Sequence, residues 1–423
     1  MQRDCGVCKV SENKTLLLLG GSMQQVVAIE AAKKCGYRTV LCDYLPDNPG
    51  QHSADKFYLV STTDREAVLE VAKSENINGV IAYSSDPAAP TAAYVAEQLG
   101  LPTNSLASVT TLSFKNLFRE HLRKAGLPCP KAVSFKVDAK LQTVLDAVKE
   151  LSLPFVIKPT DASGSKGVTV LTSENEISAA LDWARANSRN GVLIAEEYIE
   201  RSFPHVIGGD VFVVNGRIVF WGLMRCLRDE RCGLVPVGKA IPCGLNSEQT
   251  KAVKETFQKL VDSLDIRFGE LNIEALVGKD GLVYILELGS RAGGNMIPVQ
   301  LSDASGIDLV RANVMCAMGE DPGEIAWEPT SEYSVTHVLH SLQDGVYQGF
   351  ELSDAAQQAC YRKVIYQQPG DRVFRFDGAN KALGILFFKF DDAGMFNAYL
   401  DDVDAIVKAL IETNASNVNG RED

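Results

Sequence analysis

Residues 271–288 read LNIEALV-GKDG-LVYILEL, which is two largely apolar runs joined by a turn of glycine, lysine and aspartate. Runs of this kind around a short glycine-containing turn are typical of a β-hairpin. If the hairpin folds about the middle of its turn, Glu274 lies opposite Ile285 and Glu287 lies opposite Asn272. The two glutamates then lie diagonally on one face, with their Cβ atoms roughly 7 Å apart.

Two carboxylates held this close repel each other unless a cation lies between them. Oxygen ligands without a neighbouring His or Cys suit Mg²⁺, which in proteins commonly also binds a nucleotide phosphate. The competing interpretation is two exposed acids on the solvent face of a strand. The hairpin alone favours that second interpretation, so a metal site requires support from other motifs in the chain.

The composition predicts a soluble protein of several subdomains. A chain of 423 residues with 46% hydrophobic and 23% charged residues is expected to form two to four subdomains. No apolar run approaches the roughly 20 residues that cross a bilayer. Residues 1–14 show no secretory signal, so we expect a cytoplasmic protein that does not bind membranes.

The net charge of −12 argues against broad binding to a nucleic-acid backbone. The ten cysteines are scattered and are expected to be reduced thiols. Cys5 and Cys8 form a C-x-x-C in a predicted tail, and without a second pair they are not expected to bind a metal.

The order of apolar segments predicts an α/β fold. Strands alternate with helices over residues 15–99, which favours a doubly wound parallel sheet. The later elements are expected as a helix at 106–125, a strand at 132–136, a helix at 140–151, strands at 155–158 and 168–171, a helix at 174–187, a strand at 192–198, a hairpin at 210–223 around Asn215-Gly216, helices at 247–264 and 309–318, short strands after 333, and a last helix at 403–412.

Lys158 ends an apolar strand, where a lysine is costly to bury without an anionic partner. The loop Asp161-Ala-Ser-Gly-Ser-Lys-Gly167 follows it. Its glycines let the backbone fold over a ligand, while its hydroxyl and N–H groups can donate to phosphate oxygens. A mobile turn is the ordinary interpretation of such a loop, but its position after a strand-end lysine favours a phosphate-covering flap.

Three further features are individually weak. The acidic strand end Glu196-Glu-Tyr-Ile-Glu200 suits an adenine slot or an ordinary solvated strand end. Lys115 lies in a predicted helix, where a lysine is normally on the surface. Arg291 follows the second hairpin glutamate by four residues, from where a guanidinium can reach a phosphoryl group or a carboxylate.

In this order and spacing, the motifs from residue 15 to residue 318 resemble the ATP-grasp superfamily. The resemblance implies an ATP-grasp fold with an N-terminal doubly wound parallel α/β domain, a small lid subdomain and an α+β C-terminal domain. The expected divisions are a tail at 1–14, the N-terminal domain at 15–128, the lid at 129–200, the catalytic subdomain at 201–325, the C-terminal region at 326–413 and a disordered tail at 414–423.

The resemblance also implies a role for each motif. ATP is expected to contact two phosphate-binding lysines, the flap and the adenine edge, and Mg²⁺ (or Mn²⁺) is expected to bind the hairpin glutamates. Arg291 resembles the arginine that stabilises the transferred phosphoryl group or binds the acyl substrate. The expected residues are Lys115 and Lys158 for the phosphates; Ser163, Ser165, Lys166 and Gly167 for the flap; Glu196, Glu197, Tyr198, Ile199 and Glu200 for the nucleoside; and Glu274 and Glu287 for the metal.

One position departs from the family pattern. Many members carry a metal-binding Asn two residues after the second glutamate, whereas this chain has Gly289. The ligand is expected either to be missing or to be replaced by water or by Asn272, and Asn295 is a less favoured replacement. The Arg-Ala-Gly-Gly-Asn run from Arg291 is similar to that of carboxylate–amine ligases related to the L-amino-acid ligases.

The resemblance therefore implies an ATP-dependent carboxylate–amine ligase that forms an acyl phosphate and releases ADP and phosphate. Its expected partners are a small carboxylate, such as an amino acid, and an amine, and a homodimer is compatible with the sequence. Arg228 is expected to bind a substrate carboxylate or to form a salt bridge with a neighbouring acid. The alternatives are a bicarbonate-using carboxylase of the same fold and an ATP-binding sensor without turnover.

Overall fold

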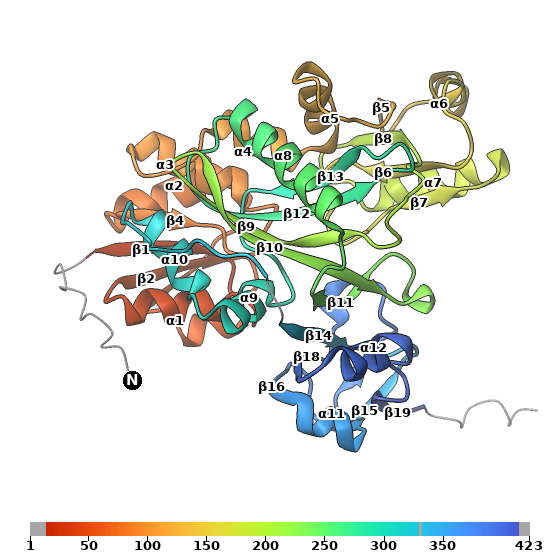
Figure 1. Cartoon of the computed structure of the whole chain (residues 1–423). Coiled ribbons are helices and arrows are strands. Elements are labelled where there is room, and N and C mark those ends of the chain that lie inside the picture. The colour runs from red at the N-terminus through yellow and green to blue at the C-terminus, as the bar shows by residue number, and fades with distance from the viewer. Residues whose placement is uncertain (1–13, 330–331, 414–423) are drawn as a thin grey trace, which may run out of the picture. The chain divides into compact units, whose positions relative to one another are not determined.

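The computed structural model describes residues 14–329 and 332–413, which group into two compact units (Figure 1). Unit 1 contains residues up to 130, 210–222 and 247–328, and unit 2 contains residues 131–209, 223–246 and 329 onward. The predicted tails, including Cys5 and Cys8, lie outside the described residues except for Lys14. The finer division into six parts stays a prediction.

Unit 1 begins with the predicted parallel sheet. Its strands β1 (Thr15–Leu19), β2 (Arg38–Asp43), β3 (Lys56–Leu59) and β4 (Gly79–Ile81) pair in the order β3-β2-β1-β4, all parallel. Figure 1 shows α1 (Val26–Lys34) on one side of the sheet and α2 (Arg65–Ser74) and α3 (Ala89–Leu99) on the other. Strands β1, β2 and β4 are largely buried because crossover helices cover both faces of such a sheet, whereas the edge strand β3 is partly exposed.

The predicted single helix at 106–125 is wrong in one respect, because it is two helices. The first, α4 (Leu106–Ser113), ends at Phe114, whose backbone is extended with φ −120° and ψ 115°. The second, α5 (Lys115–Lys124), starts directly after it. The break places Lys115 in the first turn of a helix and not in the middle of one.

The rest of unit 1 carries the hairpin of the two glutamates. The strand order is β13-β12-β9-β10, and the hairpin of β9 and β10 turns at Asn215 and Gly216, both of which have positive φ as the Asn-Gly turn predicts. A helix that the sequence analysis did not predict, α9, follows β13. The bounds are β9 (Ile207–Val214), β10 (Arg217–Arg228), α8 (Ser247–Ser263), β12 (Gly269–Val277), β13 (Val283–Gly289), α9 (Ile297–Ser305) and α10 (Leu309–Ala317).

Unit 2 opens with an antiparallel sheet of order β5-β8-β6-β7, covered by two helices. Its elements are β5 (Ala132–Lys136), α6 (Leu141–Val148), β6 (Phe155–Pro159), β7 (Thr169–Leu171), the short helix η2 (Glu174–Glu176), α7 (Ile177–Ala186) and β8 (Val192–Glu197). The predicted strands and helices of this segment are confirmed within a few residues.

The remainder of unit 2 is α+β. The second half of β10 pairs with β11, and β14, β18 and β16 follow in order, while a smaller sheet has the order β17-β15-β19. The elements are η3 (Glu230–Cys232), β11 (Pro236–Ile241), β14 (Tyr333–Leu339), β15 (Gly345–Leu352), α11 (Asp354–Ala359), β16 (Cys360–Ile365), β17 (Arg372–Val373), β18 (Gly384–Phe390), α12 (Ala393–Asp401) and β19 (Val407–Glu412).

The predicted last helix at 403–412 is wrong, because β19 occupies most of that range. Its residues pair with β15 in antiparallel register, from Val346 opposite Glu412 to Leu352 opposite Val407. The helix lies earlier, as α12 (Ala393–Asp401). A short run of alternating apolar residues fits either period, and here pairing with an available strand decides the outcome.

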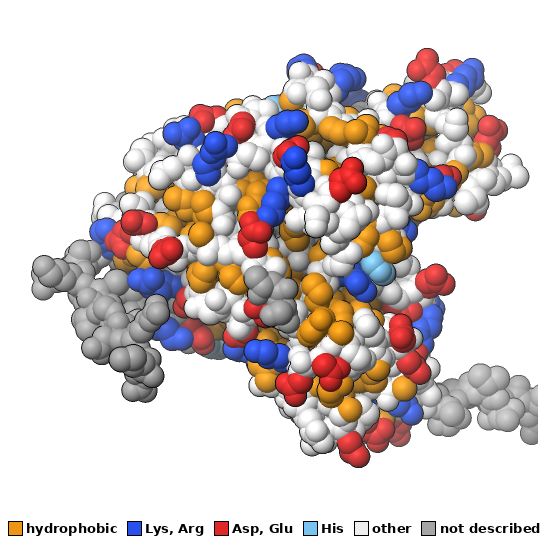
Figure 2. Space-filling model, in the orientation of Figure 1, with side chains coloured by type: hydrophobic (Ala, Val, Ile, Leu, Met, Phe, Trp, Pro, Cys, Tyr) orange, Lys and Arg blue, Asp and Glu red, His pale blue; other side chains and the backbone are white. Residues whose placement is uncertain are grey.

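Two surface observations bear on the expected partners. Within residues 14–329 and 332–413, no helix is both long and apolar enough to cross a bilayer. On the face drawn in Figure 2, Lys and Arg side chains are interspersed with Asp and Glu side chains.

Candidate nucleotide and metal site

The two hairpin glutamates lie directly opposite each other, so the predicted diagonal register is wrong. Glu274 pairs with Glu287 and Ala275 pairs with Ile285, with a register shift between Glu274 and Ala275. Leu286 is the additional residue that the shift leaves without a counterpart, which is the pattern of a β-bulge. The bulge brings the carboxylates closer than the diagonal arrangement would, because opposed residues have Cβ atoms about 4.5–5.5 Å apart.

Lys115 partly neutralises this pair of acids. Its Nζ lies 2.5 Å from Glu287 Oε1, and the lysine is only 8% exposed. The break at Phe114 explains the geometry, because it starts α5 at Lys115. A buried lysine against one of two opposed carboxylates shows that this position favours positive charge, which fits the predicted metal ligands.

Arg291 is held by Asp86, an acid that follows strand β4 of the parallel sheet. Its Nε donates to Asp86 Oδ1 at 2.8 Å, and its terminal Nη2 donates to Asp86 Oδ2 at 2.6 Å. The second terminal nitrogen donates to the Ala292 carbonyl at 2.9 Å. The arginine is therefore fixed in one orientation by a bidentate ion pair, which sequence reasoning missed because Asp86 lies 205 residues away.

The Asp86–Arg291 ion pair explains why position 289 is a glycine. A Cβ added at this position would lie 3.0 Å from Asp86 Oδ1 and 3.2 Å from Arg291 Cζ. The Asp86–Arg291 pair thus fills the space that a side chain at this position would need. Asn272, the suggested replacement ligand, is opposite Gly289 and donates to Asp210 Oδ1 at 2.7 Å.

A second buried pair of acids, Asp210 and Glu270, was not predicted. Asp210 is fully buried and Glu270 is 3% exposed. Asp210 accepts from Asn272 and from the Gly293 backbone N–H at 2.8 Å, and it shares a hydrogen bond with Glu270. Burial and the neighbouring Asp210 charge raise the pKa of Glu270 well above its ordinary value, so Glu270 carries the shared proton.

This proton predicts a dependence of stability on pH. The folded pKa of Glu270 lies above the unfolded value of 4.5. The folded state therefore holds a proton that the unfolded chain has lost, and its contribution to stability decreases from about pH 4.5 upward, by about 1.4 kcal/mol per pH unit. Glu270→Gln keeps a donor toward Asp210 without the titration, so its free energy of unfolding should fall less steeply with pH.

Urea denaturation between pH 5 and pH 8 measures this difference, where each pH unit corresponds to about 1.4 kcal/mol per proton. Glu255→Gln is the matched control, because Glu255 is an exposed helical acid of the same unit. Its slope should equal that of the unchanged protein. Equal slopes for Glu270→Gln and the unchanged protein would contradict a proton shared in the buried pair.

In unit 2, the predicted phosphate lysine and the first residue of the predicted adenine edge form an ion pair. Lys158 Nζ lies 2.6 Å from Glu196 Oε2, with side-chain exposures of 10% and 4%. The two residues lie on the paired strands β6 and β8, where Lys158 is opposite Ile194. A buried lysine thus has the anionic partner that its position required, and Glu196 is tied to it.

The predicted flap has the backbone expected of a glycine-rich loop. Gly164, Ser165 and Gly167 all have positive φ, between 62° and 72°. Ser165 Oγ donates to the Leu234 carbonyl at 3.0 Å, which ties the flap to the segment before β11. Lys166 is exposed and Ser163 is half-buried.

The other adenine-edge residues lie at and beyond the end of β8. Glu197 is exposed and accepts from the Lys131 backbone N–H at 3.2 Å. Tyr198 and Ile199 are half-buried and Glu200 is exposed, all three after the strand has ended. Their expected contacts with a nucleoside stay predictions.

Arg228 lines a large cavity of unit 2, with a volume of about 1860 Å³. One of its terminal nitrogens donates to the Leu234 carbonyl, and its Nε is buried without a partner among the described residues. Arg201, Arg225 and Arg231 line the same cavity. The predicted alternative for Arg228 was a salt bridge to a neighbouring acid. The neighbouring Asp229 instead pairs with Arg231, whose terminal nitrogen lies 2.6 Å from Asp229 Oδ2.

Among residues 14–329 and 332–413, no disulfide bond joins two of the eight cysteines. The expectation of reduced thiols stays a prediction.

Comparison with known proteins identifies the fold of this chain. Residues 115–324 match the family model described as the carbamoyl-phosphate synthase L chain, ATP binding domain. The carbamoyl phosphate synthase large chain of Thermotoga petrophila is 26% identical over 306 residues, which are 69% of this chain and 26% of that protein. The chain thus spans about a quarter of that relative's length.

A formate-dependent phosphoribosylglycinamide formyltransferase from Chlorobaculum tepidum is 26% identical over 66% of this chain and 69% of that protein. Among solved structures, an L-amino acid ligase from Bacillus licheniformis matches with a TM-score of 0.78 and 19% identity, over 96% of this chain and all (100%) of that one. A phosphoribosylglycinamide synthetase from Anaerococcus prevotii matches with a TM-score of 0.74 and 19% identity, over 95% and 100% of the two chains. Residues 115–324 of this chain therefore match an ATP-binding domain family, and the chain has the ATP-grasp fold, as the order of its motifs predicted.

Proposed function

We propose that the protein is an ATP-dependent carboxylate–amine ligase that forms ADP and phosphate through an acyl phosphate. The observation that carries the proposal is the direct opposition of Glu274 and Glu287, with Lys115 against Glu287 at 2.5 Å. Two hard oxygen ligands beside a buried ammonium fit Mg²⁺ and a phosphate tail. Glu274 and Glu287 would hold Mg²⁺ or Mn²⁺, which would neutralise charge on the phosphates when bound.

The chain's own residues would supply positioning and positive charge, which phosphoryl transfer needs more than covalent help. In unit 1, Lys115 would donate to a phosphoryl oxygen from its fixed place beside Glu287. Arg291 has five N–H groups, and three of them donate to Asp86 and Ala292. The remaining two would orient the acid oxygen that attacks the γ-phosphate.

Unit 2 would bind the nucleotide and shield the reaction from water. Lys158 would contact the phosphates, the flap at 163–167 would cover them, and the residues from Glu196 to Glu200 would hold the nucleoside. Exclusion of water protects the acyl phosphate from hydrolysis until the amine attacks its carbonyl carbon and phosphate leaves. Arg228, whose buried Nε on the cavity wall has no partner within residues 14–329 and 332–413, would bind a carboxylate of the substrate.

A phosphate-release screen tests the proposal. The purified protein is incubated with ATP, Mg²⁺ and either amino-acid pairs or small carboxylates with amines, and released phosphate and the coupled product are measured. Phosphate release that requires both a carboxylate and an amine, with an amide product, supports the ligase. ATP binding without phosphate release under every combination would instead favour the sensor.

A similar structure with bound bicarbonate supports the carboxylase alternative. It is the biotin carboxylase domain of the Hydrogenobacter thermophilus 2-oxoglutarate carboxylase, solved with MgADP, ADP and bicarbonate, with a TM-score of 0.70 and 16% identity over 89% of this chain. Incubation with bicarbonate and an amine, without any other acid, separates the two reactions. Phosphate release under these conditions would replace the ligase with a carboxylase of the same fold.

Lys158 gives a prediction for nucleotide binding. Lys158→Met removes a charge-assisted contact to phosphate, so the dissociation constant for ATP should rise at least about tenfold, which corresponds to about 1.4 kcal/mol. Isothermal titration calorimetry with ATP measures the change. Lys149→Met, at an exposed lysine of the same unit, is the matched control and should bind as the unchanged protein does.

The ion pair with Glu196 requires a second variant, because Lys158→Met leaves a buried carboxylate without its partner. The double variant Lys158→Met/Glu196→Gln removes both charges. If Lys158 contacts the nucleotide, the double variant also binds ATP weakly. Recovery of full affinity in the double variant would show that the single variant acted only through the unpaired Glu196.

A further inference from the structure

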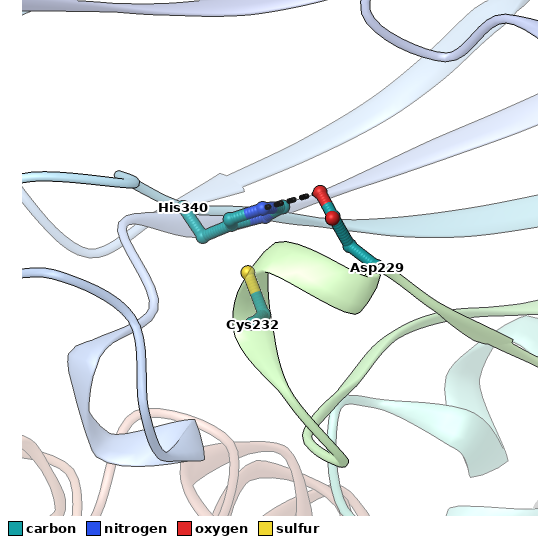
Figure 3. A group of neighbouring side chains, drawn as sticks. All are labelled: Asp229, Cys232 and His340. Atoms are coloured by element: carbon teal, nitrogen blue, oxygen red, sulfur yellow. Dashed lines mark ion pairs between the residues drawn. The ribbon is translucent and has the colours of Figure 1, made fainter.

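A cluster of three potential metal ligands lies in unit 2, away in sequence from every residue expected to bind ATP or Mg²⁺. Asp229, Cys232 and His340 each offer one ligand atom, and these atoms all lie within 4.8 Å of one another. Figure 3 shows Asp229 and Cys232 on one short helix, with His340 facing both of them from another segment. We propose that this cluster is a zinc site.

Local structure places the first two ligands together. Asp229 is the N-cap of η3 (Glu230–Cys232), and the Cys232 N–H donates to the Asp229 carbonyl at 2.9 Å. Residues three apart in a 3₁₀ turn lie on the same side of it, which brings the carboxylate and the thiol to one face. Gly233, with φ 65°, then ends the turn in a conformation that favours glycine.

His340 presents a defined nitrogen to that face. Its Nδ1 lies 2.7 Å from the Val338 carbonyl, which only accepts, so Nδ1 carries the proton. Its Nε2 is therefore the unprotonated ligand nitrogen, and it lies 3.9 Å from Asp229 Oδ2. A histidine whose second nitrogen donates to a backbone carbonyl has the orientation found in metal sites.

The surroundings fix the ring and the carboxylate. The His340 ring stacks on His337, with ring centroids 5.8 Å apart, and packs against Phe376 at 5.1 Å. Asp229 accepts from Arg231, which also contacts Asp404 at 2.7 Å. Outer hydrogen bonds of this kind hold ligands in place before a metal binds.

The ligand set selects the metal by its chemistry. One sulfur, one nitrogen and one oxygen are the donors that tetrahedral Zn²⁺ takes, with bonds of about 2.0–2.3 Å. Bonds of that length require ligand atoms about 3.3–3.8 Å apart. The 3.9 Å between His340 Nε2 and Asp229 Oδ2 is close to this range, and the 4.8 Å limit of the whole cluster would have to contract by about 1 Å. Asp229 and His340 line the cavity of about 1860 Å³, through which water can supply a fourth ligand.

Electrostatics agree with this assignment. The hydrogen bond from Arg231 holds the pKa of Asp229 below its usual range, and burial lowers the pKa of His340. Both groups are thus in their metal-binding forms at neutral pH. Burial raises the pKa of the Cys232 thiol to about 11, and a bound divalent cation would release its proton.

A bound zinc ion would fix the segment that the flap contacts. It would join η3 to the end of β14, and two residues beyond Cys232 the Leu234 carbonyl accepts from Ser165 of the flap. The structural consequence is an ordered wall beneath the flap. This effect requires no turnover, so the site can be tested without any assay of ligase activity.

The test uses Co²⁺ as a spectroscopic probe for the zinc position, in a Cys5→Ser/Cys8→Ser background that removes the other cysteine pair. We expect one Co²⁺ per chain with a thiolate-to-cobalt charge-transfer band, displaced by Zn²⁺. The Glu274 and Glu287 carboxylates cannot produce that band. Cys232→Ser should abolish it, and His340→Gln or Asp229→Asn should weaken Co²⁺ binding at least about tenfold.

Cys360→Ser is the matched control, because Cys360 is a free thiol of the same unit outside the cluster, and it should keep the band. Where Cys232→Ser fails to fold, alkylation of the unchanged cysteine replaces it: Zn²⁺ should protect the Cys232 peptide, but not the Cys360 peptide, from a thiol reagent. Any one of three results would overturn the zinc site and show an ion-pair network only. These results are the absence of a charge-transfer band, a band that survives Cys232→Ser, and a lack of protection by Zn²⁺.

Discussion

Glu287→Gln is expected to reduce ATP-dependent phosphate release by about a hundredfold or more, the loss typical when one charge-stabilising group is removed from an active site. The glutamine keeps the shape of the side chain and can still accept from Lys115, which lies 2.5 Å from the carboxylate. It removes the negative charge that opposes Glu274 across the hairpin. Steady-state phosphate release at saturating ATP, with the active substrate pair, measures the effect.

Folding and the metal are controlled separately. Near-ultraviolet circular dichroism and thermal denaturation should show a folded Glu287→Gln variant, and Glu255→Gln, at an exposed acid of the same unit, should keep full activity. Raising the Mg²⁺ concentration should restore part of the activity if the loss reflects weaker metal binding. Unchanged phosphate release in folded Glu287→Gln would remove Glu287 from the metal site.

The hairpin shows what a sequence pattern can and cannot predict. Alternating apolar residues predicted the two strands and the shared face of the glutamates, because the period of a strand fixes which side chains share a face. The register was wrong by the one residue that the bulge at Leu286 absorbs. A bulge depends on packing around the strand and has no reliable signal in a single sequence.

The surroundings of the site were beyond sequence reasoning for a different reason. Asp86 reaches Arg291 across 205 residues, and Asp210 meets Gly293 across 83. Nothing in the local sequence marks these acids as buried, since most aspartates are exposed. Lys115 was predicted from the family resemblance. The interruption between the two helices at Phe114, which places Lys115 against Glu287, was found only in the structure.

The departure from the family at position 289 gives the second large prediction. Gly289→Asn introduces the residue that the ATP-grasp resemblance implies at this position, and a simple ligand count would predict stronger metal binding. The structure predicts the opposite, because any Cβ there lies 3.0 Å from Asp86 Oδ1 and 3.2 Å from Arg291 Nε. The new side chain must displace the bidentate pair that orients Arg291, so phosphate release should fall by at least about tenfold, as misplacement of a charge-stabilising group typically causes.

A graded series separates displacement of Arg291 from a general loss of stability. Gly289→Ala adds only the Cβ and should cause a smaller loss of phosphate release than Gly289→Asn. Gly294→Ala should leave the melting temperature unchanged, because its Cβ would meet only Gln24 Oε1 at 3.6 Å.

Asp86→Asn removes the charge that fixes Arg291 without adding volume, and it should also lower phosphate release. Since Gly289→Asn and Asp86→Asn act on one ion pair, their combined loss should be smaller than the sum of the two. An increase in activity with Gly289→Asn would mean that Arg291 does not depend on Asp86 and that the asparagine ligand is simply missing from this chain.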